Sequence, residues 1–524
     1  MARGAGPGGP ARALTAADVV VFGATAAGVA AAVAAREGGA SVVLVGPDGH
    51  VGGMVSGGLS WTDVGDPRVL GGLARHFYEL VASHYRAPLW AVKGPEPRVA
   101  ERLLVQLLER AGVEVRLGEA LAAVAVSDGR ITAFETTGGG YEAAVFVDAG
   151  YEGDVMAAAG VPYAVGREPR DLYGETWAGR QHAARPGKHN FSVLLSPFAD
   201  DGSLLPGIRE PELDERGWPA ERLGEGDGGV QAYAFRLCLT DRAENRLPLT
   251  EPPGYDPDDF ELLRRYLAAA GDRLEAGDLL GLVPNLLPKG KCDVNSIGPC
   301  SLNVLDGSNR AYPDGDAAAR DRVRERHLRY TQAFLFFLSH DDSVPVAVRR
   351  EVGRWGLCAD EFPDTGGWPH QLYVRDGRRM NGEYVLQEPD LLDARPQPDV
   401  VGIGSYNVDI REVERTWRFL PEYVRTPAVF NEGYVSLAVP PYPIPYRSLT
   451  PRRPDCANLL VPVCLSASHV AFGSVRMEPT LMLLGQAAGT AAALAARRGA
   501  AVQDVDRDEL QSRLAATGQV LALP

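Results

Sequence analysis

The amino-acid sequence predicts an α/β fold, in which a domain built on a parallel sheet and a three-stranded antiparallel meander is interrupted by a large α+β insertion. Near the amino terminus, an apolar strand, a glycine-containing turn, an alanine-rich helix and a second apolar strand follow one another. Three short strands separated by turn residues come later. The middle of the chain loses this regularity, and an apolar strand and a Gly/Ala-rich helix return near the carboxyl terminus.

Size and charge limit the possible classes of protein. At roughly 100–200 residues per domain, a chain of 524 residues predicts two to four domains. The formal net charge of -15 argues against a nucleic-acid partner, because phosphate binding needs clustered positive charge. The apolar stretch 480–496 contains Gln486 and ends at two arginines, and it is shorter than the ~20 residues of a membrane helix. We therefore expect a buried helix and no membrane partner.

The amino terminus and the cysteines suggest a cellular location. Residues 1–17 are rich in Gly, Ala, Pro and Arg and lack the apolar segment of a signal peptide, so we expect a disordered arm. None of the six cysteines has C-x-x-C spacing, which gives no indication of a zinc or dithiol motif. We predict no metal site, and reduced thiols of a cytoplasmic protein.

The first strand-turn-helix unit predicts a dinucleotide site of the Rossmann type. The strands are expected over 18–22 and 41–45, with the helix over 29–36. Gly23 would let the chain turn tightly out of the strand, and Gly28 would let the helix pack close to it. The free N–H groups and positive dipole end of the helix then face a pyrophosphate.

This unit departs from the usual pattern at two positions. Thr25 occupies the third position of G-x-G-x-x-G, so either the pyrophosphate lies slightly farther away or Thr25 donates its hydroxyl to it. The acidic residue that usually meets the ribose comes late, at Asp48. Either Asp48 or the backbone contacts the ribose, and the alternative for Asp48 is a place in a surface turn.

The remaining pattern predicts the other elements and the domain limits. Helices are expected over 72–84, 98–111, 258–269, 317–338 and 479–496, and strands over 113–117, 121–126, 130–136, 141–147 and 458–462. We predict a cofactor domain formed by 18–162 and 440–524, with a substrate or cap domain, 163–439, inserted between its two parts.

Several stretches give a more specific indication. The segments Asp18–Asp63, Asp148–Asp154, Tyr373–Glu383, Pro445–Leu449 and Ser466–Gly489 resemble the bacterial FAD-dependent oxidoreductase family, whose Rossmann domain is of the glutathione-reductase type. The resemblance implies FAD as the cofactor. The implied FAD-binding residues are Gly23, Ala24, Thr25, Ala26, Ala27, Gly28, Val45, Asp48, Gly52, Gly53, Met54, Asp148, Ala149, Gly485, Gln486, Ala487 and Ala488.

The resemblance also implies how these segments meet the cofactor. Residues 52–54 would pass beside the flavin, and Asp148 with Ala149 would end a strand near the phosphates. Residues Gly485–Gly489 would open a second helix whose positive end faces the pyrimidine side of the flavin ring. The alternative for the two glycines is close packing of an alanine-rich helix.

The catalytic candidates lie just before that second helix. His469 is a candidate base that removes a hydroxyl or amine proton as hydride leaves carbon, and the alternative is a structural histidine. Arg476 is a candidate for binding a substrate carboxylate or stabilising the reduced flavin, with an ion pair to Glu478 as the alternative. Tyr446 and Arg447 lie in a proline-rich loop and either reach the substrate or pack.

Weaker candidates lie elsewhere in the chain. Polar clusters of the middle region, which are also typical of surface loops, are Lys291 with Asp293 and Asn295, Arg378 with Arg379, and Asn407 with Asp409. His50 is a conceivable site of covalent flavin attachment.

These observations favour an FAD-dependent oxidoreductase that transfers hydride between a small polar organic substrate and flavin N5, passing electrons to oxygen or another acceptor. An FAD-dependent monooxygenase or hydroxylase is the first alternative, although no separate NAD(P)H-binding unit is visible. A binding protein with a flavoprotein fold and no redox activity is the second. A plain NAD dehydrogenase would leave the carboxy-terminal helix without a role. The sequence does not identify the substrate, the acceptor or the oligomeric state.

Overall fold

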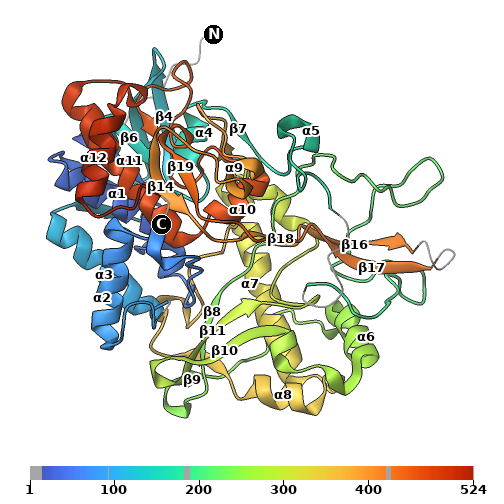
Figure 1. The fold of residues 1–524 in the computed structure, drawn as a ribbon. Helices are drawn as coiled ribbons and strands as arrows, with labels where there is room; N and C mark the ends of the chain where they lie inside the picture. Colours follow the sequence, from blue (N-terminus) through green and yellow to red (C-terminus); the bar gives the residue numbers. More distant parts are fainter. Residues whose placement is uncertain (1–13, 93, 182–188, 421–425, 523–524) are drawn as a thin grey trace, which may run out of the picture.

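A seven-stranded sheet forms the centre of the cofactor-binding part in the computed structural model, which describes residues 14–92, 94–181, 189–420 and 426–522 (Figure 1). Its strands are β1 (Leu14–Phe22), β2 (Val42–Gly46), β3 (Glu114–Leu117), β4 (Leu121–Ser127), β5 (Arg130–Thr136), β6 (Gly140–Asp148) and β20 (Leu459–Leu460). The order is β3-β2-β1-β6-β5-β4, with β20 beside β6. Strands β3, β2, β1, β6 and β20 are parallel, while β4, β5 and β6 form the antiparallel meander. The predicted α/β fold with its meander is confirmed.

The first strand is longer than the sequence predicted. It begins at Leu14, and residues 14–17 pair with β6, so these residues are not part of a disordered arm. Val19 and Val21 pack into one core, while Val20 and Phe22 pack into a second core on the opposite face of the sheet. Burial on both faces explains why this strand reads as a continuous apolar run. Residues 1–13 of the predicted arm lie outside the described residues.

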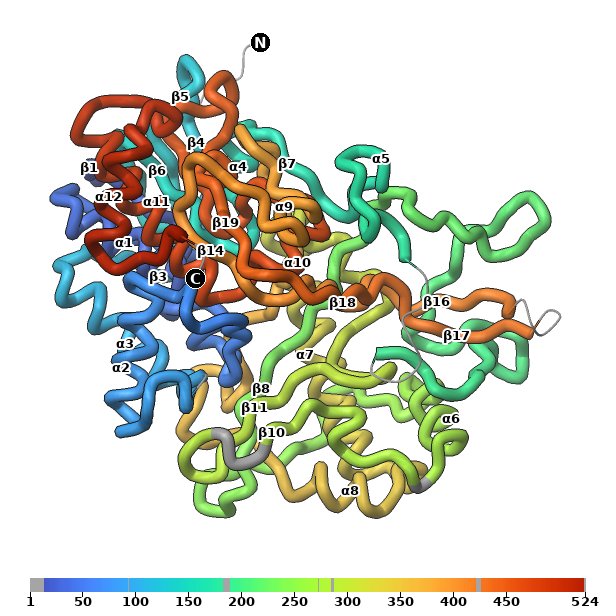
Figure 2. Tube along the Cα trace, in the orientation of Figure 1, coloured from blue at the N-terminus to red at the C-terminus, as the bar shows by residue number. Residues whose placement is uncertain are grey.

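Helices from both ends of the chain cover the sheet. They are α1 (Ala26–Glu37), α2 (Gly72–Tyr85), α3 (Pro97–Ala111), α4 (Asp154–Ala158), α10 (His469–Val475), α11 (Glu478–Arg498) and α12 (Arg507–Ala516). Helix α11 packs along α1 and against β1 and β6, and Figure 2 shows these blue and red segments side by side. Of the described helices, only α11 is long and apolar enough to cross a membrane, and its residues are almost all buried in this core.

The middle of the chain builds a second sheet and several hairpins. The five-stranded sheet, in the order β10-β11-β8-β12-β9, contains β8 (Leu237–Thr240), β9 (Arg246–Leu247), β10 (Leu280–Leu287), β11 (Lys291–Ser296) and β12 (Gly356–Cys358). The helices are α5 (Arg170–Tyr173), α6 (Glu261–Ala270), α7 (Ala317–His340), α8 (Val346–Gly353) and α9 (Glu388–Leu392). Helices α6 and α7 match the two helices predicted for this region.

Four two-stranded pairs complete the fold and connect its parts. They are β7 (Tyr163–Ala164) with β13 (Arg379–Met380), β14 (Val400–Gly404) with β19 (Tyr442–Pro445), β15 (Val408–Ile410) with β18 (Val435–Leu437), and β16 (Glu414–Phe419) with β17 (Pro427–Glu432). The pairing of β14 with β19 joins the middle region directly to the carboxy-terminal segment. Strand β15 packs against α10, which carries the predicted catalytic histidine.

Candidate active site

The turn between β1 and α1 needs glycine at both predicted positions. Gly23 has a φ of +102°, and a Cβ there would lie 2.5 Å from the Gly150 nitrogen. A Cβ on Gly28 would lie 1.9 Å from the Gly23 carbonyl oxygen. The Gly23 N–H donates to the Val45 carbonyl oxygen at 2.7 Å, which fixes the turn to β2. The amino-terminal end of α1 therefore points toward the carboxyl ends of the parallel strands, where a dinucleotide binds.

Thr25 caps α1. Its Oγ1 accepts a hydrogen bond from the Gly28 N–H at 3.1 Å and donates its proton to the Ala149 carbonyl oxygen at 2.8 Å. The hydroxyl proton is therefore engaged within the protein, and the hypothesis that Thr25 donates it to the pyrophosphate is wrong for this arrangement. The two alanines that follow, Ala26 and Ala27, are fully buried in the first turn of the helix.

A pocket lies between this turn and the end of β2. Its lining residues are Gly23, Ala24, Thr25, Gly46, Pro47, Asp48, His50, Gly53, Gly150, Tyr151, Glu152, Arg324, His370 and Gln371. A helix amino terminus for phosphates lies on one side, and a half-exposed carboxylate, Asp48, lies at the end of the second strand, where the ribose of a dinucleotide is bound. The Oδ1 atom of Asp48 is 4.0 Å from Nη1 of Arg324. The residues present fit FAD.

The loop at residues 52–54 closes the far end of this pocket. Gly52 and Gly53 both have left-handed backbone, with φ of +112° and +56°, and a Cβ on Gly53 would lie 2.5 Å from the Tyr151 hydroxyl. The Met54 N–H donates to this hydroxyl at 2.9 Å, and the hydroxyl donates to Oε1 of Glu478 at 2.6 Å. Tyr151 thus ties the loop to the first turn of α11.

Glu478 marks the true beginning of the carboxy-terminal helix. Its carboxylate contacts Tyr151 and not Arg476, so the ion pair between Arg476 and Glu478 that was the alternative for Arg476 is not formed. Burial raises the pKa of Glu478 to about 7, although the hydrogen bond from Tyr151 lowers it. Its second oxygen, Oε2, is buried without a hydrogen-bond partner in the part of the chain that the structure describes. The positive dipole end of α11 therefore lies beside the 52–54 loop.

The helix predicted over 479–496 is confirmed as α11, but the helix start at Gly485–Gly489 that the resemblance implied is wrong. These residues lie within α11, about two turns after its first residue. A Cβ on Gly485 would lie 2.1 Å from the Ala27 carbonyl oxygen, and one on Gly489 would lie 2.0 Å from that of Ala31. The glycines let α11 approach the backbone of α1, as the packing alternative expected. Gln486, Ala487 and Ala488 are buried and do not line the pocket. The side chain of Gln486 accepts a hydrogen bond from the Leu73 N–H and donates one to the Thr517 hydroxyl.

Asp148 and Ala149 shape the loop that carries Tyr151. The carboxylate of Asp148 accepts hydrogen bonds from the N–H groups of Met156 at 2.9 Å and Gly150 at 3.2 Å, and burial raises its pKa to about 7. Ala149 donates to the Phe22 carbonyl oxygen and accepts from Thr25. Neither residue lines the pocket. Both instead hold in place residues that do, Asp148 through Gly150 and Ala149 through Thr25.

His469 begins α10 within a fully buried charged network. Its Nδ1 lies 2.8 Å from Oδ2 of Asp376, and its main-chain N–H donates to Glu168 at 2.9 Å. Arg379 donates to both acids, at 2.6 Å to Asp376 and 2.7 Å to Glu168. The Nε2 of His469 is buried and has no hydrogen-bond partner among the described residues. The contact with Asp376 therefore orients the imidazole.

Arg476 ends α10 in a second polar group. It donates to the Tyr373 hydroxyl at 2.8 Å and to the Asp409 carbonyl oxygen at 2.7 Å. The carboxyl of Asp63 interacts with Arg476 and accepts a hydrogen bond from Tyr406, while burial raises its pKa overall. Arg476 is buried, whereas the two tyrosines and Asp63 are partly exposed. The two tyrosines and Asp63 therefore form the partly exposed side of this group.

Tyr446 and Arg447 make structural contacts. The Tyr446 hydroxyl is buried and donates to the Val502 carbonyl oxygen at 2.8 Å. Arg447 forms a two-point ion pair with Asp399 and donates to Gln397. None of these partners lines the cofactor pocket or contacts His469 or Arg476, so the packing alternative describes both residues.

Two of the predicted polar clusters are structural. The Lys291 ammonium lies 2.7 Å from Glu96, 2.8 Å from Asp360 and 2.6 Å from Glu361. These three carboxylates are close enough together to hold a metal ion, but Lys291, Arg98 and Lys289 together compensate their charge. Asn295 accepts only a hydrogen bond from the adjacent Ser296 N–H. In the second cluster, Arg378 pairs with Asp154 and Asp314, and Arg379 belongs to the His469 network.

Other predicted residues lie next to the Arg476 group. Asp293 accepts from the Ser60 N–H at 3.2 Å and forms an ion pair with Arg236, which links β11 to the loop after Met54. Asp409 contacts Arg476 directly, and Asn407 is exposed beside Tyr406. The structure therefore brings together Asp293 and Asp409, which lie far apart in the sequence.

His50 is held by two carboxylates. Its Nδ1 lies 3.1 Å from Glu101 and its Nε2 2.9 Å from Asp364, and its ring stacks on His370 at 3.9 Å. Burial lowers the pKa of His50, but the two carboxylates raise it overall. With both nitrogens engaged, this geometry argues against covalent attachment of the flavin.

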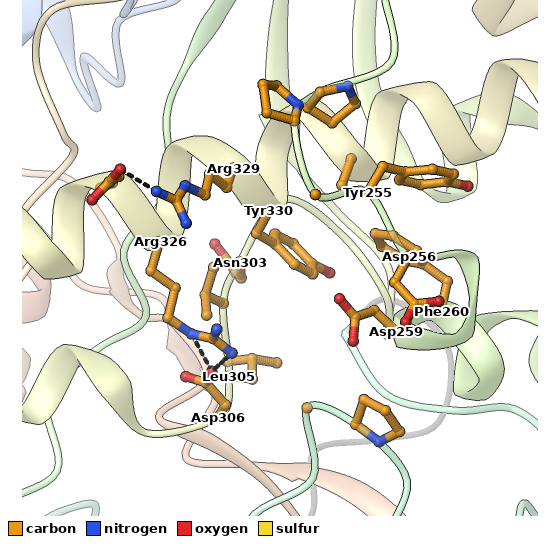
Figure 3. Close-up of a pocket in the computed structure, with 18 of the residues that line it drawn as sticks. Tyr255, Asp256, Asp259, Phe260, Asn303, Leu305, Asp306, Arg326, Arg329 and Tyr330 are labelled. Carbon is orange, nitrogen blue, oxygen red and sulfur yellow. Dashed lines mark hydrogen bonds and ion pairs between the residues drawn. The ribbon is translucent and has the colours of Figure 1, made fainter.

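A separate cavity of about 380 Å³ lies in the middle region (Figure 3). Figure 3 shows that its walls include Tyr255, Phe260, Asn303 and Tyr330. Two of its arginines are already paired, Arg326 with Asp306 and Arg329 with Glu325. Its lining residues are different from those of the cofactor pocket.

Several residues that build the site were not predicted from the sequence. Tyr151, Tyr373, Arg236 and Arg375 were not among the candidates. Tyr151 directly follows the strand end at Asp148–Gly150, and this position beside the cofactor is a signal that could have identified it. The arginines gave no comparable signal, because they come from loops whose spatial relationship depends on the whole middle region.

Comparison with known proteins now assigns the fold to a family. The family model described as FAD dependent oxidoreductase matches residues 18–514. No curated protein matches the chain. Similar solved structures include thioredoxin reductase from T. acidophilum (20% identity, 25% of this chain and 34% of that chain, TM-score 0.17). Others are the OxyS anhydrotetracycline hydroxylase from Streptomyces rimosus (20% identity, 30% and 36%, TM-score 0.21) and the L-amino acid deaminase from Proteus vulgaris (18% identity, 32% and 55%, TM-score 0.22).

The matched part spans about a third to a half of each of these three solved chains. Since the family model covers nearly the whole sequence, it supports an enzyme that uses FAD. The chain belongs to the FAD dependent oxidoreductase family.

Proposed function

We propose that this enzyme is of the dehydrogenase or oxidase type and transfers hydride between a small polar organic substrate and flavin N5. One observation carries the proposal: a partly exposed polar group around Arg476 adjoins the cofactor pocket. Arg476 precedes Glu478 by two residues, and Glu478 is bonded to Tyr151, which lines the pocket. A substrate held by Arg476 would therefore lie beside the cofactor.

The protein's part in cofactor binding follows from the pocket. The start of α1 would hold the pyrophosphate, Asp48 the ribose, and the 52–54 loop with Tyr151 and the start of α11 the flavin end. When bound, FAD supplies a two-electron acceptor whose electronics depend on nearby charge. The positive end of α11 favours negative charge at that place.

His469 is proposed as the general base. Asp376 holds its Nδ1 side, which leaves Nε2 to accept the proton of a substrate hydroxyl or amine. The aspartate also stabilises the protonated imidazole that results. The rise of α10 places His469 and Arg476 about 10 Å apart along the helix axis. His469 would therefore accept the proton, while Arg476 binds a part of the substrate that is distant from the reacting carbon.

Arg476 and its neighbours are proposed to bind and orient the substrate. Tyr373, Asp409 and Asp63 offer donors and acceptors at fixed positions, because each is hydrogen-bonded or charged against a partner. Fixed polar groups hold a substrate in reacting geometry without reorganisation during the reaction. The residues of α10 and of most of α11 are buried, which keeps this geometry rigid and excludes water from the side of the site that these helices form.

An anaerobic screen of the holoenzyme tests this function. Polar alcohols, amines and acids are added to the oxidised enzyme without NAD(P)H, and the flavin absorbance is followed. Bleaching by one of these compounds alone is the expected result. Bleaching only after NAD(P)H is added would instead indicate the monooxygenase alternative, and a flavin that no compound and no NAD(P)H bleaches would indicate a binding protein.

We also propose a cytoplasmic location. All six cysteines are buried and free, including Cys238 and Cys358, whose sulfur atoms lie 3.9 Å apart without a disulfide. Free thiols so close together suit a reducing compartment.

A further inference from the structure

Four buried arginines gather beneath the partly exposed polar group described above. We define the arginine cluster as Arg236, which precedes β8, Arg375, which follows Tyr373, Arg411, which follows β15, and Arg476, which ends α10. None is more than 7% exposed. The guanidinium carbons of Arg375 and Arg476 lie 4.4 Å and 5.8 Å from the same ring, that of Tyr373.

Three of these arginines have a carboxylate partner. Arg236 pairs with Asp293, and Arg476 lies 3.4 Å from a carboxylate oxygen of Asp409. Arg411 lies 3.6 Å from Glu412, but Glu412 is shared with His189, whose Nδ1 is 2.8 Å away. Asp63 is a fourth carboxylate, beside Arg236 and Arg476. These four carboxylates therefore act on the other three arginines of the arginine cluster.

Arg375 has no ion-pair partner among the residues that the structure describes. It donates to the Ala232 carbonyl oxygen at 2.5 Å and to Oδ1 of Asn303 at 3.3 Å, both of which are neutral. Burial and the neighbouring Arg411 and Arg476 lower its pKa to about 9. A guanidinium stays protonated in proteins, so a positive charge is buried here without a counter-ion.

Two other buried arginines of the described residues are compensated twice. Arg167 pairs with Asp227 and Glu432, and Arg379 pairs with Glu168 and Asp376. Each of these guanidinium groups meets two carboxylates, as expected for a charge that serves the fold. Arg375 differs from these two, as does the buried Arg415, which donates to Asn431 and to the Pro299 carbonyl oxygen. Arg375 in addition lies beside Arg411, Arg476 and Arg236, which makes its charge more costly.

A ligand of the arginine cluster would enter from the side of the substrate group, where its partly exposed neighbours lie. Asp63, Tyr373, Tyr406 and Tyr434 are all partly exposed and surround it. The phosphates of FAD belong at the other end of the cofactor pocket, at the start of α1. An anion that reaches Arg375 and Arg411 is therefore a ligand other than the pyrophosphate.

We propose that the arginine cluster binds an oxyanion of the substrate, a carboxylate or a phosphate, which serves as the missing counter-ion of Arg375. Planar guanidinium groups bind both kinds of oxyanion through paired hydrogen bonds. This inference rests on the proposed function, because it assigns the substrate class of the same site: a polar molecule with an oxidisable carbon and an anionic group.

The test uses the FAD-loaded enzyme with three probes, benzoate, benzamide and inorganic phosphate. Binding is measured by calorimetry and by perturbation of the flavin absorbance. Benzoate or phosphate is expected to bind, and the neutral benzamide is not. Arg375→Met is expected to weaken anion binding about tenfold or more, because a buried charge pair loses one partner. Arg375→Lys keeps the positive charge and is expected to retain part of the anion binding. The control is Arg329→Met, at an exposed position of α7, which is expected to leave anion binding unchanged.

Thermal stability separates a binding role from a structural one. Removing an uncompensated buried charge does not destabilise the unliganded fold, so Arg375→Met is expected to melt at or above the wild-type temperature without an anion. Arg167→Met, which breaks two ion pairs, is expected to melt lower. A lower melting temperature for Arg375→Met together with unchanged anion binding would show a structural arginine and overturn the proposal.

The two proposals fail in different ways. If benzoate and phosphate both fail to bind, or bind no better than benzamide, the oxyanion proposal is overturned even if an uncharged substrate bleaches the flavin. If an oxyanion binds through Arg375 but no compound ever bleaches the flavin, the oxyanion proposal stands and hydride transfer fails. Tighter binding of benzoate or of phosphate identifies which oxyanion the substrate carries.

Discussion

Gly485 of α11 lies so close to Ala27 in the first turn of α1 that an added Cβ would be 2.1 Å from the Ala27 carbonyl oxygen. This contact places the helix that begins beside the proposed flavin end of the pocket directly against the helix that begins at the proposed phosphate end. The distance between the two helices is thus set by glycine, and the shape of the cofactor site depends on it.

Gly485→Ala is expected to destabilise the protein by about 1–3 kcal/mol, since overpacking against backbone forces the helices apart. The displacement should also lower the FAD content of the purified protein. Thermal unfolding and the ratio of flavin to protein absorbance measure the two effects. The control is Gly139→Ala, where an added Cβ meets nothing within 4 Å. Equal behaviour of the two variants would contradict the proposed packing.

Glu478 makes a pH-dependent contribution that can be isolated with Glu478→Gln. Its pKa of about 7 in the folded state lies above its value in the unfolded chain, so the folded state keeps a proton that the unfolded state releases. Stability from this group is therefore lost as the pH rises from about 4.5 to 7. The wild type should lose up to about 3 kcal/mol relative to the variant across this window.

Melting temperatures at saturating FAD, measured for both proteins at several pH values, check this expectation. Asp148 and Glu175, whose pKa values burial also raises to about 7, contribute a slope of the same sign to both proteins and cancel in the difference. Glu135→Gln, at an exposed position of β5, is the control. A difference between wild type and Glu478→Gln that does not change with pH would contradict the assignment.

His469→Gln is expected to slow flavin reduction by about 10²–10⁴-fold, the usual contribution of a general base. The FAD content should stay close to that of the wild type, because His469 does not line the cofactor pocket. Stopped-flow measurement of anaerobic bleaching gives the rate. Tyr446→Phe loses only the hydrogen bond to Val502 and should reduce the flavin at the wild-type rate. A slow Tyr446→Phe and an unimpaired His469→Gln would reverse the roles assigned to the two residues.

The flavin is expected to be non-covalently bound, since both nitrogens of His50 are engaged by Glu101 and Asp364. Acid precipitation of the holoenzyme followed by centrifugation tests this directly. Yellow colour should remain in the supernatant, and a yellow pellet would show a covalent link.

The sequence predicted those parts of the fold that depend on local pattern. The apolar strand before Gly23, the turn itself and the alanine-rich helix are local features, and the structure confirms all three. The pattern also predicted α11 over 479–496, within one residue of its true start. The turn that the resemblance implied at Gly485 was misplaced because glycine has two physical uses. Gly485 was interpreted as a turn residue, whereas it provides close helix contact, and the actual start is at Glu478, followed by a proline that suits a first turn.

The substrate side was much less predictable. Arg476 and Asp409 were both candidates, but Arg375, Arg411 and Tyr373 were not, because their proximity arises from loops joined by the pairing of distant strands. A spacing rule cannot reveal a buried charge without a partner. That property appears only when the side chains of all neighbouring segments are in place.

The central claim is that a bound substrate delivers hydride directly to the flavin. The anaerobic half-reaction of the holoenzyme, with a bleaching substrate deuterated at the carbon to be oxidised, measures this step in a single turnover. The account predicts a normal primary isotope effect on the bleaching rate in the absence of NAD(P)H. A bleaching rate that depends on NAD(P)H and is insensitive to the substrate deuterium would contradict it.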